Sequence, residues 1–284
     1  MKRYNIKNIL VPIDFSPLSL FALQHAERIG KLTRSHITLL NVVENIADSM
    51  GVDGGSLAAA MSVERDIQEQ NTTSLSRLAK ASARRTQLKV DARVRIGRPS
   101  ETITRVATTL KSNLIVMGTH GASGFVGRLL GSTTYRVATL SDIPVLSVHK
   151  APPTRGFSNI IYPVRAGTGA AAKFPFALAF ANLFDARVHV VGQMMSDSRQ
   201  GSAHVAQLCS RIERRFKEHE LITKRSLSSQ EQFAEAVIHY AGALPGPLVV
   251  IVHERDFRLV EVFKESFAKK ILHKKLSPIL TIPA

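Results

Sequence analysis

The second half of the sequence repeats the order of apolar runs found in the first half. Asn8–Asp14 (NILVPID) has a counterpart at Asn159–Arg165 (NIIYPVR), and Ile143–Leu146 (IPVL) has one at Ser277–Leu280 (SPIL). Self-similarity at such a distance is typical of a tandem duplication of one structural unit. The chain is therefore expected to contain two similar domains.

The length of the chain agrees with this interpretation. At about 150 residues per domain, 284 residues correspond to about two domains, and each is large enough to bury its own core. We expect a first domain at 1–150, a linker at 151–156 and a second domain at 157–284. A linker this short keeps the two copies in contact, so we expect an internal dimer with approximate two-fold symmetry.

Strand and helix patterns alternate along the first copy. Residues 8–14 form an apolar run typical of a buried parallel strand, and Ser16 with Pro17 begins a helix that Gly30 is expected to end. A Gly- and Ala-rich loop is expected over 45–62. Further strands are expected at 36–43, 90–96, 113–117 and 144–148, with helices at 63–85, 100–110 and 132–140.

This alternation predicts an α/β fold with two tandem Rossmann-like domains. Each domain should contain a five-stranded parallel sheet with helices on both faces, because parallel strands need crossover helices between them. No apolar run approaches the roughly 20 residues that span a bilayer, and residues 1–7 do not have the pattern of a secretory signal. Cys209 is the only cysteine, so no disulfide forms within the chain. We expect a cytoplasmic protein without a membrane span.

The charge balance is unusual, because the chain has 38 Lys and Arg residues but 22 Asp and Glu residues, which gives a net charge of +16. Such a surface attracts anions. However, Trp is absent and aromatic residues make up 6% of the chain, so few stacking platforms for single-stranded nucleic acid are available. Small polyanions such as nucleotides are therefore the expected partners, and nucleic acid is not.

A glycine-rich segment between a predicted strand and a predicted helix is the strongest candidate for a binding site. Five glycines fall between Met117 and Ser132. Glycine permits positive φ and close approach of the backbone, so several N–H groups can point into one hollow. The following helix presents its positive end to an anion. A loop that serves only as a tight turn remains the alternative at this point.

The spacing of this segment resembles the nucleotide motif of the universal stress protein family. The motif runs from Gly118 over two residues to Gly121, then over nine residues to Gly131 and Ser132. Val11–Ser16 (VPIDFS), Gly97–Pro99 (GRP) and the strand beginning at Ile143 are also similar to that family. The resemblance covers residues 1–150 and, more weakly, 157–284. It implies an adenine nucleotide alpha hydrolase-like fold and ATP binding, with Mg²⁺ as the companion of ATP.

The resemblance also implies a role for individual residues of the first copy. Pro12 and Ile13 would flank the adenine, Asp14 would meet the ribose or the adenine, and Val42 would contact the adenine through its backbone. The residues implied for the ribose and phosphates are Gly118, Gly121, Gly131, Ser132 and Thr133. Asp14 has an alternative role, because an aspartate at this place could instead cap the following helix.

The second copy departs from the family pattern at each of these places. Arg165 stands where the first copy has Asp14, and residues 247–284 contain no glycine. Glu254 and Asp256 lie where phosphate would have to approach, and they would repel it. We therefore predict that the second domain does not bind ATP and serves as a packing partner or an interaction surface.

Three functions of different classes are compatible with the sequence. The preferred prediction is a nucleotide-binding regulator of a stress response, with one ATP site, an unidentified protein partner and an internal pseudo-dimer that could also pair into homodimers. The second is a slow ATPase, for which His120 is the only candidate base. The third is a scaffold that binds protein or nucleic acid through its basic surface, independently of nucleotide. No catalytic residue and no metal ligand is assigned.

Overall fold

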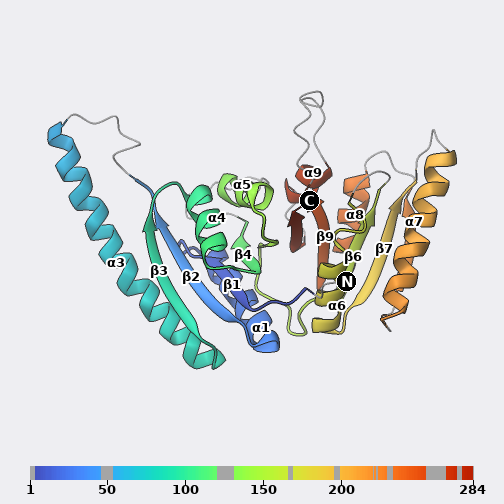
Figure 1. Ribbon diagram of the computed structural model, residues 1–284, viewed down its shortest axis with the longest axis horizontal. Helices are drawn as coiled ribbons and strands as arrows, with labels where there is room; N and C mark the ends of the chain where they lie inside the picture. Colours follow the sequence, from blue (N-terminus) through green and yellow to red (C-terminus); the bar gives the residue numbers. More distant parts are fainter. Residues whose placement is uncertain are drawn as a thin grey trace.

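The computed structural model describes residues 4–45, 54–119, 131–165, 169–194, 199–219, 221, 223–228, 233–253, 267–273 and 277–283. In this part of the chain, one sheet runs through the whole molecule, in the order β3-β2-β1-β4-β5-β10-β9-β6-β7-β8. Helices cover both of its faces (Figure 1). The predicted α/β class with a parallel-dominated sheet is confirmed.

The first half supplies five parallel strands. Its elements are β1 (Asn8–Pro12), α1 (Pro17–Thr33), β2 (His36–Val43), α3 (Gly54–Thr86), β3 (Val90–Ile96), α4 (Pro99–Thr109), β4 (Leu114–Gly118), α5 (Ser132–Leu140) and β5 (Val145–Val148). β1 lies between β2 and β4, so the carboxyl ends of these three strands meet at one edge of the sheet.

The second half repeats this order of elements. They are β6 (Asn159–Val164), α6 (Phe174–Phe184), β7 (Arg187–Gln193), α7 (Arg199–Lys217), β8 (Thr223–Ser228), α8 (Phe233–Gly242), β9 (Pro247–His253), α9 (Phe267–His273) and β10 (Ile279–Pro283). The strand order β8-β7-β6-β9-β10 is that of the first half. The register agrees as well, since Asn8 lies opposite His36 and Asn159 lies opposite Arg187.

The two halves join through β5 and β10, which pair antiparallel with Leu146 opposite Leu280. Figure 1 shows the first half on the left and the second half on the right of this junction. Two copies related by a two-fold axis can extend one sheet only by pairing the same edge strand in opposite directions. The pairing also removes two strand edges that would otherwise be open to other chains.

Each face of the sheet carries a hydrophobic core that extends across both halves. α1, α3, α6 and α7 cover one face, and α4, α5, α8 and α9 cover the other. Successive strand residues alternate between the two cores, so that Ile9 and Val11 join the first and Leu10 joins the second. Because both of their faces are buried, central strands such as β1, β4 and β9 are nearly continuous apolar runs rather than alternating ones.

Two sequence-based boundaries are wrong. α1 continues past Gly30 to Thr33 and ends at Arg34, whose φ of 54° is left-handed. Gly30 lies inside the helix, where a Cβ atom would come within 2.8 Å of Leu88 Cδ1. The expected loop over 45–62 is also wrong in its second part, because α3 begins at Gly54. Residues 46–53 of that loop lie outside the described residues.

A buried histidine ties α1 to the connection between the two halves. His25 is 2% exposed, and its Nε2–H donates a hydrogen bond to the carbonyl oxygen of Lys150 at 3.1 Å. Its ring stacks on Phe157 with the ring centres 5.5 Å apart. Burial lowers the pKa of His25 to about 4, although the bond to Lys150 opposes this effect. His25 is therefore neutral in the folded protein near neutral pH.

The free energy of unfolding is expected to decrease by about 3 kcal/mol between pH 7 and pH 4. The unfolded chain binds a proton at His25 below its ordinary pKa of 6.5, whereas the folded chain does so only near 4. Stability from neutral His25 is thus complete above pH 6.5 and is lost as the pH falls toward 4. Urea unfolding of His25→Gln at several pH values should show a correspondingly smaller pH dependence than wild type. If the free energy of unfolding of His25→Gln depended on pH as strongly as that of wild type, the pH dependence could not be attributed to His25.

Candidate functional site

The carboxyl ends of β1, β2 and β4 bring three of the sequence-predicted site residues to one edge of the sheet. Asp14 follows β1, Val42 lies near the end of β2, and Gly118 ends β4. In open parallel sheets, ligands bind outside the carboxyl ends of the strands. The fold therefore places these residues where such a ligand would bind.

At the end of β1, the chain turns sharply into α1. Pro12 is half-buried, Ile13 is buried, and the Ile13 N–H donates to the Leu40 carbonyl at 2.8 Å. The exposed Asp14 accepts a hydrogen bond on Oδ1 from the Ser16 N–H at 3.0 Å. The N-cap of α1 is Ser16, so the alternative that Asp14 caps this helix is wrong. Asp14 instead shapes the turn that precedes the cap.

Phe15 occupies this turn with a left-handed φ of 62° and is 37% exposed. A bulky residue rarely adopts this conformation, and holding one there costs about 1–3 kcal/mol. Strained backbone of this kind concentrates at functional sites. Nothing in the sequence pattern indicated the strain, because phenylalanine has no preference for positive φ.

At the end of β2, a pair of asparagines supports the backbone beside Asp14. Asn41 is 4% exposed, and its Nδ2 donates to the carbonyl of Ile13 at 2.8 Å. Asn71 of α3 donates in turn from Nδ2 to Asn41 Oδ1 at 3.0 Å. Val42 follows and is half-buried. The asparagines were not predicted; the only available signal was a polar residue within the apolar strand at 36–43.

At the end of β4, hydrogen bonds close the base of the glycine-rich segment. The Gly131 N–H donates to the Thr119 carbonyl at 2.6 Å, and Thr134 Oγ1 donates to the Gly118 carbonyl at 2.7 Å. The two ends of the segment are therefore held together beside α5. Residues 120–130, which include the predicted site residue Gly121, lie outside the described residues.

Gly118 also allows α1 to approach β4 closely. A Cβ atom at this position would lie 2.8 Å from both the backbone carbon and the backbone oxygen of Leu18. Only glycine fits such a contact, because real Cβ atoms essentially never come this close to backbone. Gly118 thus fixes the distance between the first turn of α1 and the end of β4.

The amino terminus of α5 has features that suit an anion. Gly131 is its N-cap, no side chain of the described residues caps it, and its first turn contains no acidic residue. By contrast, the Ser16 side chain caps α1, and α4 has Glu101 in its first turn. Ser132 is exposed and Thr133 is half-buried at this end. Uncompensated N–H groups and the positive end of the helix dipole are suited to phosphate.

In the second half, side chains fill the corresponding place. Arg165, the counterpart of Asp14, donates from Nε to Gln193 Oε1 at 3.2 Å. Its guanidinium lies over the ring of Phe267, with Cζ 5.1 Å from the ring centre. Phe267 opens α9 and stacks on Phe233 with the ring centres 5.4 Å apart. Arginine and two aromatic rings thus stand where the first half offers a carboxylate and an open helix end.

Among the residues that the structure describes, no helix combines the length and the apolar character that a membrane span requires. Within the same ranges, no three His, Cys, Asp or Glu side chains are grouped so that they could hold a metal ion.

The sheet order and the helices on both of its faces define a Rossmann-like α/β protein. The model of the Universal stress protein family matches residues 5–149 of the chain. The chain therefore belongs to the universal stress protein family.

Relatives of known sequence agree with the family. One universal stress protein of Methanocaldococcus jannaschii is 32% identical over 145 residues, which are 51% of this chain and 82% of that protein. A second from the same organism is 26% identical over 154 residues, covering 51% of this chain and 95% of that protein. These relatives match about half of the chain.

A solved structure matches the whole chain. The crystal structure of a universal stress protein from Archaeoglobus fulgidus DSM 4304 superposes with a TM-score of 0.76. It covers 99% of this chain and 97% of its own, with 16% sequence identity. At this level of identity, the similarity shows that the fold is shared along the full length.

Proposed function

We propose that this protein is an ATP-binding regulator of a stress response, with one ATP site in its first half. The observation that carries the proposal is the open amino terminus of α5 beside the closed base of the glycine-rich segment. The family membership supports it, because the spacing of Gly118, Gly131 and Ser132 resembles the nucleotide motif of universal stress proteins.

In this proposal, the ends of β1 and β2 hold the adenosine. Pro12 and Ile13 flank the adenine, and the backbone of Val42 contacts its edge. An ionised carboxylate accepts hydrogen bonds and donates none, so the exposed Asp14 suits the hydroxyl groups of the ribose. The bonds from Asn41 to Ile13 and from Ser16 to Asp14 hold these acceptors in place before ATP arrives.

The phosphates lie at the start of α5 in the same proposal. The backbone N–H groups of Ser132 and Thr133 donate to phosphate oxygens, and Gly131 leaves the approach free of a side chain. Gly121 belongs to this phosphate site as well, and its role is proposed from the motif alone. Mg²⁺ accompanies the phosphates.

We also propose that the second half binds no ATP. Arg165 stands at the position that corresponds to Asp14, and Phe267 begins α9 as Ser132 begins α5. Moving these two side chains to admit a nucleotide would break a hydrogen bond and a cation–π contact. The second half acts instead as the packing partner of the first through β10. It offers a surface for an unidentified protein partner. The cytoplasmic location and the pairing of chains into homodimers stay predictions.

Equilibrium calorimetry with ATP and Mg²⁺ tests the proposal directly. We expect one ATP per chain with a dissociation constant in the micromolar range, about −8 kcal/mol of binding free energy. Two ATP molecules per chain would contradict the assignment of the second half. A flat titration of protein freed from any co-purified nucleotide would contradict the proposed function itself.

Asp14→Ala is expected to weaken ATP binding by about 10- to 100-fold. Loss of a hydrogen bond to a charged group costs about 1.5–3 kcal/mol, and the substitution also removes the acceptor for the Ser16 N–H. The same titration measures the effect. Asp66→Ala is the matched control, because it removes an exposed aspartate from α3. Equal affinity of wild type and Asp14→Ala would remove Asp14 from the site.

A further inference from the structure

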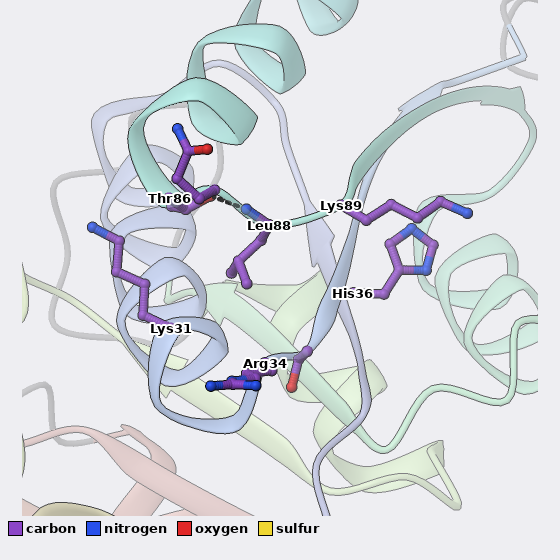
Figure 2. A pocket seen from close by; sticks show the side chains of 8 residues that line it. Lys31, Arg34, His36, Thr86, Leu88 and Lys89 are labelled. Carbon is purple, nitrogen blue, oxygen red and sulfur yellow. Dashed lines mark hydrogen bonds between the residues drawn. The ribbon is translucent and has the colours of Figure 1, made fainter.

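A hollow lies at the amino ends of the strands, whereas the proposed ATP site lies at their carboxyl ends. It has a volume of about 440 Å³ and opens at the amino ends of β2 and β3 (Figure 2). This volume is within the range of about 300–1,000 Å³ that small-molecule sites occupy. Its lining residues are Lys31, Arg34, Ser35, His36, Thr86, Gln87, Leu88 and Lys89.

Two tight turns with the same geometry build this hollow. α1 ends in Arg34 with a φ of 54°, and α3 ends next to Gln87 with a φ of 60°. The Ser35 N–H donates back to the Gly30 carbonyl at 3.1 Å, and the Gln87 N–H donates to the Ala83 carbonyl at 2.8 Å. Each turn leads directly into a strand, so the backbone of the lining residues is fixed.

The hollow carries a concentrated positive charge. The ion pairs found in the described ranges include none that involves Lys31, Arg34 or Lys89, and all three side chains are exposed. The acidic group found beside the hollow is Asp91, whose Oδ2 lies 2.9 Å from His36 Nε2. A small anion in the hollow would therefore be attracted by three cations that form no ion pair within the described ranges.

The uncharged polar groups of the hollow already have partners. Ser35 Oγ donates to the Ile6 carbonyl at 2.9 Å, Thr86 Oγ1 to the Ser82 carbonyl at 2.7 Å, and Gln87 Nε2 to the Arg84 carbonyl at 2.8 Å. Because Thr86 and Gln87 already donate to carbonyl groups at the end of α3, the cations of the hollow are not needed to bond these carbonyls. Besides Gln87 and His36, the groups left to bond a ligand are the ammonium and guanidinium groups, which bind anions strongly.

The cations are divided between two sides of the hollow. Figure 2 shows Lys31 and Arg34 at the end of α1 on one side, and Lys89 near His36 on the other, with Leu88 between them. We propose that this hollow binds a small polyanion with two or more phosphate groups, one group at each side. A single phosphate would reach only one set of cations at a time.

Calorimetry with inorganic tripolyphosphate tests this site in the full chain. The triple variant Lys31→Gln/Arg34→Gln/Lys89→Gln should bind tripolyphosphate at least tenfold more weakly than wild type. Its affinity should also depend less steeply on salt, because fewer cations contact the anion. The control variant Arg65→Gln/Arg77→Gln/Lys80→Gln removes three exposed cations from α3 and should bind as wild type does. Orthophosphate should bind wild type at least tenfold more weakly than tripolyphosphate.

Three results would overturn the proposal. If both triple variants bound tripolyphosphate more weakly to the same extent, the net charge alone would explain the effect. Loss of tripolyphosphate binding in Gly118→Ala, with retention in the Lys31/Arg34/Lys89 variant, would place the anion at the proposed ATP site. Binding of duplex DNA that depends on these three cations, without binding of tripolyphosphate, would make the hollow part of a nucleic-acid surface.

Discussion

Leu280→Asp is expected to lower the free energy of unfolding by at least about 4 kcal/mol. Leu280 lies on β10 opposite Leu146 of β5, and both side chains are fully buried at the junction of the two halves. Truncating a buried leucine costs about 2–5 kcal/mol, and the new carboxylate would be desolvated with no partner in an apolar core. We expect the urea midpoint of this variant to fall well below that of wild type.

Urea unfolding followed by circular dichroism measures the effect, with Leu140→Asp as the matched control. Leu140 is 60% exposed, so the same substitution there should change the free energy of unfolding by less than about 1 kcal/mol. Because the core on the face of α1 also includes residues of the second half, wild type should unfold in one transition. If the two halves of wild type unfolded in separate transitions, the junction would not be important for the structure. The same would follow if Leu280→Asp and Leu140→Asp lowered the free energy of unfolding by similar amounts.

The junction itself illustrates what the sequence could not determine. Both β5 and β10 were predicted as strands from short apolar runs, and the contact between the copies followed from the short linker. A strand with both faces buried carries no alternation that sets its register. The continuous ten-stranded sheet and the pairing of Leu146 with Leu280 therefore required the structure.

The wrong boundaries have a common cause, because glycine was interpreted as a helix end at Gly30 and as a loop residue over 45–62. Gly30 is inside α1, where a Cβ atom would come within 2.8 Å of the end of the Leu88 side chain. Gly54 begins α3 and is followed by alanines at 58–60, whose high helix propensity was given too little weight.

The gathering of Asp14, Val42 and Gly118 at one edge was predictable, because parallel strands align their carboxyl ends. The support behind these residues was not. Asn41 and Asn71 form a hydrogen bond at 3.0 Å across 30 positions of sequence, and no local pattern indicates such a pair. The replacement of Asp14 by Arg165 in the second copy was evident from the sequence, whereas the contact of Arg165 with Phe267 and the stacking of Phe267 on Phe233 were not.

The sequence explained the glycine at position 118 incompletely. Glycine in this segment was expected to provide positive φ or close approach of the backbone. Gly118 is not among the positive-φ glycines, which in the described ranges are Gly97, Gly156 and Gly246. Its contact with the Leu18 backbone is what excludes a side chain. The requirement at Gly118 is therefore space for α1 beside β4.

Gly118→Ala is accordingly expected to weaken ATP binding by at least tenfold and to destabilise the fold by about 1–3 kcal/mol. The added Cβ would lie 2.8 Å from the Leu18 backbone, so the start of α1 must move away from β4, at the cost typical of overpacking. Asp14 and Ser16 immediately precede α1, so this movement displaces the proposed ribose contact relative to the start of α5.

The matched control is Gly242→Ala at the end of α8, where a Cβ atom meets nothing within 4 Å. Alanine there should leave ATP affinity unchanged and raise the free energy of unfolding by up to about 1 kcal/mol. Thermal unfolding and calorimetry with ATP measure both quantities on the same preparations. If Gly118→Ala lost stability and kept full ATP affinity, the spacing between α1 and β4 would matter for packing alone. In that case, the proposed contact between Asp14 and the ribose would not depend on where α1 begins.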